Sequence, residues 1–64
     1  MKEYQRIQML NNNYCQDGIF KGAIGYILNV YDDNYCEVEF SDGEGITYAL
    51  QSIDIKDFIV IDKN

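Results

Sequence analysis

Residues 35–40 read Tyr35-Cys36-Glu37-Val38-Glu39-Phe40, a run whose side chains alternate in polarity. Successive side chains of a β-strand point to opposite faces of the sheet, so this alternation predicts a strand with one buried face. The side chains predicted to face a core are Cys36, Val38 and Phe40. Those predicted to face away from it are Tyr35, Glu37 and Glu39. Turn-forming residues flank the run at 32–34 and 41–45, so we expect it to belong to two consecutive hairpins.

The rest of the chain reads as further short β-rich runs separated by polar turns. We predict strands at residues 4–10, 23–31, 46–50 and 57–61, a loop at 11–18 and a single 3-10-like turn at 51–56. Gly22 and Gly25 bracket the start of the second strand, where glycine indicates a bend, a bulge or a close approach of backbone. Five short strands joined in this way predict a small, strongly bent antiparallel barrel.

A chain of 64 residues makes one domain, here residues 1–64, with a small core. Ile53 and Ile55 are expected to drop from the 3-10-like turn into that core, and Cys36 is expected to pack as a small buried side chain. The other predicted core residues are Ile7, Met9, Phe20, Ile24, Ile27, Val30, Val38, Phe40, Ile46, Leu50, Phe58 and Val60.

The charge balance excludes several classes of function. Five Lys and Arg against eleven Asp and Glu give a formal net charge of −6, which argues against nucleic acid and fits a basic protein partner. The chain has no His, and so lacks the usual general base and the commonest transition-metal ligand. We therefore predict no enzymatic activity, no catalytic residue, no cofactor, no metal site and no small-molecule substrate.

Cysteine usage and hydropathy bear on the compartment. Cys15 and Cys36 alone resemble neither a disulfide framework nor a structural zinc site. The first residues lack the apolar core of a signal peptide, and no apolar run approaches the ~20 residues that cross a bilayer. We expect a cytoplasmic protein with reduced thiols and no membrane contact.

The candidate binding residues gather around the alternating run. Glu37 and Glu39 share a face with Tyr35, and Tyr31 precedes the first hairpin loop. The remaining candidates are carboxylates of the two hairpin loops: Asp32, Asp33, Asp42 and Glu44. No Lys or Arg lies between Lys21 and Lys56. These residues form either an acidic docking face for a basic protein or a solvated face that keeps a small apolar barrel in solution.

Several runs resemble the small bacterial family DUF4926. They are residues 18–31 (GIFKGAIGYILNVY), 35–40 (YCEVEF), 42–43 and 47–50, with Asp54-Ile55 at the place of the family's Asp-Leu pair. The likeness covers residues 18–56, and Tyr26 stands where the family usually has Thr. The resemblance implies an all-β fold, a five-stranded SH3-like antiparallel barrel similar to KOW modules, with one short 3-10 turn before the last strand. It also implies a bacterial accessory protein found beside toxin-type reading frames.

Charge and resemblance together favour a small acidic protein-binding module. The leading hypothesis is an immunity protein or antitoxin that neutralises a basic toxin domain, such as a nuclease, by covering its active or substrate-binding surface. The alternative is a KOW-like accessory module that binds RNA, the ribosome or an enzyme subunit. A third hypothesis is a module that assembles with its own copies.

Overall fold

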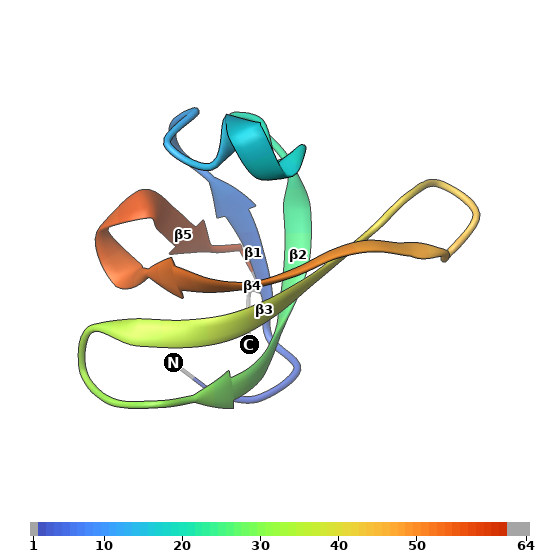
Figure 1. Cartoon of the computed structure of the whole chain (residues 1–64). Coiled ribbons are helices and arrows are strands. Elements are labelled where there is room, and N and C mark those ends of the chain that lie inside the picture. The colour runs from blue at the N-terminus through green and yellow to red at the C-terminus, as the bar shows by residue number, and fades with distance from the viewer. Residues whose placement is uncertain (1, 62–64) are drawn as a thin grey trace.

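Five antiparallel strands form one strongly bent sheet in the computed structural model, which describes residues 2–61 (Figure 1). The sheet order is β4-β3-β2-β1-β5, and two short 3-10 turns complete the fold. The elements are β1 (Arg6–Met9), η1 (Cys15–Asp17), β2 (Ile24–Val30), β3 (Tyr35–Ser41), β4 (Thr47–Asp54), η2 (Ile55–Asp57) and β5 (Phe58–Val60). Both the five-stranded all-β architecture and the 3-10 turn before the last strand are confirmed.

The fourth strand is longer than predicted. β4 continues to Asp54, so the predicted turn at residues 51–56 is wrong for its first four residues. The cause is pairing with β3, which gives each of these residues a partner as far as Tyr35 opposite Asp54. The turn is η2 instead, and Asp54 caps it: its Oδ1 accepts a hydrogen bond from the Lys56 N–H at 2.9 Å.

The other predicted strand boundaries differ from the observed ones by one or two residues. The loop predicted at residues 11–18 also contains the short turn η1, which ends at Gly18 in a left-handed conformation. Among the described residues there is no helix with the length and apolar character needed to cross a membrane.

The concave side of the sheet encloses the core. On β3 the side chains alternate as predicted, with Cys36, Val38 and Phe40 buried. The other buried apolar residues are Ile7, Met9, Ile19, Ile27, Ile53 and Phe58. Partly buried around them lie Tyr14, Ala23, Val30, Ala49, Ile55 and Val60. Burial raises the pKa of the Cys36 thiol, whereas Cys15 on η1 is exposed.

Four predicted core residues are exposed, and strand parity explains two of them. On β2 the inward positions near its start are Gly25 and Ile27, so Ile24 faces outward with 38% of its surface exposed. On β4 the buried Ile53 lies on the inward face, so Leu50, three positions earlier, lies on the opposite face and is 55% exposed. Two residues separated by an odd number of positions in a strand lie on opposite faces of the sheet. A continuous apolar run does not show which of the two faces is buried.

The other two exposed residues lie in turns. Ile46 belongs to the loop between β3 and β4, which projects beyond the core (Figure 1). Phe20 is the first residue of a turn in which the Ala23 N–H donates a hydrogen bond to the Phe20 carbonyl. The preceding residue, Ile19, is buried in the core in its place.

Gly25 marks the closest approach of backbone to core side chains. A Cβ placed there would lie 2.6 Å from Cγ1 of Val38 and 2.9 Å from ring carbons of Phe40. Non-bonded carbon atoms do not approach each other so closely, so only glycine lets the β2 backbone lie this near to the side chains of β3. Gly22, with φ at +91°, supplies the left-handed turn before β2. The predicted close approach of backbone is confirmed at Gly25, whereas a Cβ at Gly22 would meet nothing within 4 Å.

Replacing Gly25 by alanine should therefore lower the free energy of unfolding by about 1–3 kcal/mol, since the added methyl overpacks the core. Gly43→Ala is the matched control, because a Cβ there meets nothing within 4 Å. We expect that control to change stability by no more than about 0.5 kcal/mol. Urea unfolding followed by circular dichroism measures both. Equal stability of the two variants would contradict the close packing described for Gly25.

Candidate functional site

Strand β3, which lies between β2 and β4, places the predicted acidic side chains on the convex face of the sheet. Glu37 and Glu39 are half-buried because neighbouring strands flank them on both sides. Glu39 lies opposite Tyr26 of β2 and Leu50 of β4. Its immediate cross-strand neighbours are therefore an aromatic and an aliphatic side chain.

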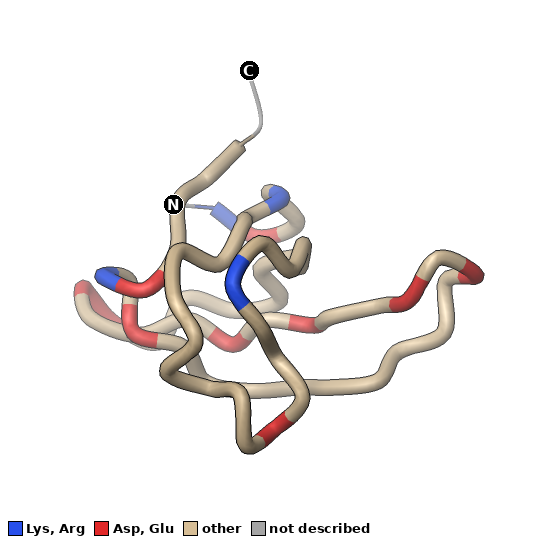
Figure 2. Tube along the Cα trace, turned by 90° about the horizontal axis from the view of Figure 1, so that it is seen from above, with Lys and Arg blue, Asp and Glu red and all other residues tan. Residues whose placement is uncertain are grey.

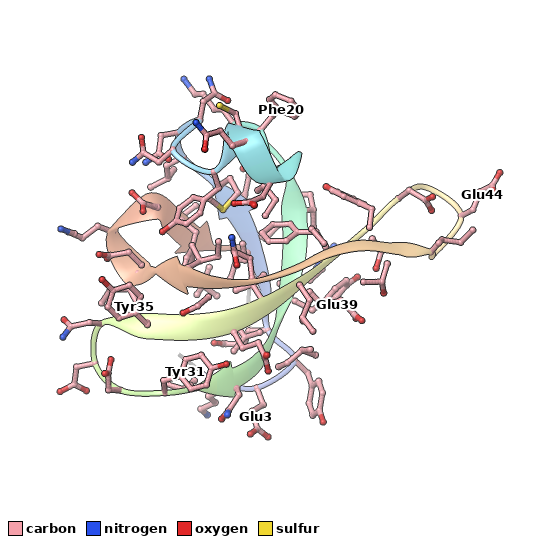
Figure 3. The ribbon with its side chains drawn as sticks, in the orientation of Figure 1. Glu3, Phe20, Tyr31, Tyr35, Glu39 and Glu44 are labelled. Carbon is pink, nitrogen blue, oxygen red and sulfur yellow. The ribbon has the colours of Figure 1, made fainter. Side chains whose placement is uncertain are left out.

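The eight predicted residues form a band, not one compact patch. β3 contains seven residues, so its two hairpin loops lie about 20 Å apart. Tyr31 and Tyr35 lie at one end of the band and Glu44 at the other (Figure 3). Figure 2 shows acidic positions strung along one arm of the long hairpin and continuing to its tip. A partner would have to lie along β3 to contact both loops.

Two of the loop carboxylates shape their own turns. Asp32 Oδ1 accepts a hydrogen bond from the Asn34 nitrogen at 2.7 Å. Asp42 Oδ1 accepts one from the Glu44 nitrogen at 2.8 Å. Such side-chain bonds to the following main chain stabilise turns. These two residues therefore hold the loops, and their substitution would change loop structure as well as charge.

Two other loop carboxylates have no such structural role. Within the described part of the chain, the side chains of Asp33 and Glu44 make no hydrogen bond or ion pair, and both residues are exposed. Their charges are available to a partner without disturbing the fold. They are the cleanest positions at which to test the acidic band.

Each of the two glutamates of β3 has a hydroxyl group as a neighbour. Glu39 Oε2 accepts a hydrogen bond from the Thr47 hydroxyl at 2.8 Å. The pKa of Tyr31 is raised by partial desolvation of its phenol, by the charge of Glu37 and by its hydrogen bond to that carboxylate.

A polar cluster missed by the sequence analysis ties the first loop to η2. Asp57 accepts hydrogen bonds from Asn11 Nδ2 at 2.9 Å, Asn13 Nδ2 at 3.2 Å and the Tyr14 hydroxyl at 3.0 Å. The Tyr14 oxygen in turn accepts the Asp54 N–H at 3.0 Å. The only sequence signal was the Asn-rich run at 11–13, which indicated a loop but not its distant partner.

The same cluster changes the acidity of Asp57. Partial burial raises the pKa of its carboxyl group, but hydrogen bonds from Asn11, Tyr14 and Asn13, and the charge of Lys56, outweigh that effect. The net pKa of Asp57 therefore lies below its ordinary value. Because the folded pKa is lowered, the resulting stability is present above the unfolded value of about 3.9 and is lost as the pH falls through the folded value.

We predict that Asp57→Asn lowers the free energy of unfolding by about 1–3 kcal/mol at neutral pH, since it weakens charge-assisted hydrogen bonds. It should also flatten the loss of stability that the parent protein shows below about pH 4. Urea unfolding at a series of pH values measures both effects, with Asp33→Asn as a control that makes no such bonds. The same acid dependence in Asp57→Asn and the parent would rule out this role.

The chemistry available to the band is that of a charged contact surface. Within residues 2–61, no three His, Cys, Asp or Glu side chains lie together in a way that could hold a metal ion, and there is no pocket. The carboxylates can pair with Lys or Arg side chains of another molecule, and the exposed tyrosines can pack against it.

The strand order and the 3-10 turn before β5 define a small SH3-like barrel. The chain belongs to the family described as domain of unknown function (DUF4926), whose model matches residues 3–60. The match extends beyond the expected residues 18–56 and takes in β1 and β5. No curated protein and no solved structure matches the chain.

Proposed function

We propose that this protein is a small cytoplasmic protein-binding module that docks onto a basic partner. The particular role we propose is that of an immunity protein or antitoxin. It would neutralise a basic toxin domain, such as a nuclease, by covering the toxin's active or substrate-binding surface. No catalytic chemistry and no cofactor are assigned to the barrel itself.

The acidic band along β3 carries this proposal. Six carboxylates occupy residues 32–44, and no Lys or Arg lies between Lys21 and Lys56 to neutralise them. The band continues onto a hairpin that extends away from the rest of the chain (Figure 2). An acidic field of this kind attracts a basic protein over several ångströms and speeds association with it.

Two tyrosines at one end of the band supply contact area. Tyr31 is 52% exposed and Tyr35 45% exposed, and both lie beside the Asp32-Asp33 loop. Tyrosine has few rotatable bonds and a large surface, so it is enriched among the residues that anchor interfaces. Carboxylates flanked by tyrosines suit a surface that normally binds a phosphate backbone, which is the basis for proposing a nuclease.

Reversing charges in the band tests the proposal. We expect Asp33→Lys with Glu44→Lys to weaken binding to the cognate partner by about two orders of magnitude and to slow association, because attraction becomes repulsion. Reversal of Glu37 and Glu39 should act in the same direction. Surface plasmon resonance against the partner co-purified from the native host measures rate and affinity.

Glu3→Lys, which lies outside the β3 hairpins, is the control, and it is compared with Asp33→Lys and with Glu44→Lys made singly, each of which changes the charge by the same amount. Thermal melting of each variant checks that the fold persists. If the band variants bind the partner as tightly as the Glu3 variant does, the band is not the interface.

A second candidate function is favoured by the number of exposed aromatic rings. Of the six tyrosines, all but Tyr14 are exposed, and exposed rings can stack on bases. A KOW-like accessory module that contacts RNA, the ribosome or an enzyme subunit would use them. Filter binding with total RNA at low salt separates the two functions: appreciable, salt-sensitive retention would contradict the antitoxin proposal.

A further inference from the structure

One edge of the sheet is formed by β4, which pairs with β3 on one side and with no strand on the other. The main-chain groups of alternate residues in a strand point to opposite sides. The Ile55 N–H reaches back to the Asn34 carbonyl, while the Asp54 N–H points away from β3, to the Tyr14 hydroxyl. By this alternation, Leu50 and Ser52 also direct their N–H and C=O groups away from β3.

These outward groups are not used within the fold. In the described part of the chain, no donor or acceptor bonds the outward main chain of Leu50 or Ser52, and both residues are exposed. The Tyr14 hydroxyl satisfies the next outward N–H, that of Asp54, and so limits the unpaired stretch at that end. We refer to the outward main chain of Leu50 and Ser52 as the open edge.

Two carboxylates border the open edge, and a third lies one strand behind it. Asp54 ends β4 itself, and Glu39 lies on β3, opposite Leu50, on the convex face. Asp17 of η1 reaches the strand from the other side, where its Oδ2 accepts a hydrogen bond from Gln51 Nε2 at 2.7 Å. Lys56 lies 3.7 Å from the Asp54 carboxylate and is itself largely exposed, so it compensates only one of the three.

We propose that the open edge of β4 accepts a basic β-strand from the partner, which extends the sheet by a sixth strand. Unpaired N–H and C=O groups on a sheet edge are a template for strand addition, in which main-chain bonds give affinity and side chains give specificity. This inference rests on the proposed function for its basic partner and adds the way in which that partner binds.

The charges select the occupant. A second copy of this chain would bring its own carboxylates against these and would carry a further net charge of −6. Like charges on neighbouring strands destabilise pairing, whereas opposite charges stabilise it. A strand with an apolar residue over Leu50 and Lys or Arg toward Glu39, Asp17 and Asp54 satisfies both the hydrogen bonds and the charges of the edge.

The test uses a defined probe, an acetylated and amidated heptapeptide of alternating lysine and valine, titrated into the ¹⁵N-labelled protein. We expect the largest amide shifts at Leu50 and Ser52. The same peptide with N-methylated amides keeps its charge but cannot donate hydrogen bonds, and it should bind at least about tenfold more weakly.

Ser52→Pro tests the edge from the protein side. It removes an outward N–H without removing a bond to β3, a position at which an edge strand tolerates proline, and Ser52→Ala is its control. We expect the alanine variant to bind the peptide as the parent does and the proline variant to lose at least about tenfold in affinity. The methylated peptide acts on the parent protein, so the test stands even if the proline variant does not fold.

Three results would overturn the inference. The first is equal binding of the methylated peptide, or shifts confined to the two hairpin loops, which would leave acidic docking in place without strand addition. The second is concentration-dependent shifts at Leu50 and Ser52 without peptide, which would show that a second copy occupies the edge. The third is the absence of peptide binding at low salt. Failure of the proposed function appears separately, in the charge-reversal variants at Asp33 and Glu44, which do not touch the edge.

Discussion

The approach of β2 to β3 at Gly25 is the constraint on which the remaining structure depends. With no side chain at this position, Val38 and Phe40 of β3 fill the space against the β2 backbone. That packing commits the even-numbered side chains of β3 to the core. Tyr35, Glu37 and Glu39 must then face outward, so the placement of the acidic band follows from a steric contact on the other side of the same strand.

The sequence predicted the parts of the fold in which polarity alternates and erred where it does not. In residues 35–40 every second residue is polar or amphipathic, so the buried face was unambiguous. Residues 46–50 offered no such contrast, and Leu50 was assigned to the wrong face. The length of β4 could not be predicted from its own residues, because it is pairing with β3 that extends the strand to Asp54.

The candidate site was predictable in its members but not in its arrangement. The carboxylates of residues 32–44 were visible as a charge pattern, yet their spread along a strand and the turn-forming roles of Asp32 and Asp42 required coordinates. Contacts between residues far apart in the sequence could not be predicted: Asn11 and Asp57 are 46 positions apart, and only the folded chain brings them into contact. The same holds for Asp17, which the first loop brings to Gln51 beside the open edge.

An acidic outer face and an unpaired strand edge thus lie side by side on this barrel, and under our proposal the two together distinguish a basic strand from other partners. Amide hydrogen exchange of the free protein, measured residue by residue along β4, tests this arrangement most directly. We predict slow exchange at Ala49, Gln51 and Ile53, whose main chains pair with β3, and fast exchange at Leu50 and Ser52. Equal protection at all five residues would contradict it.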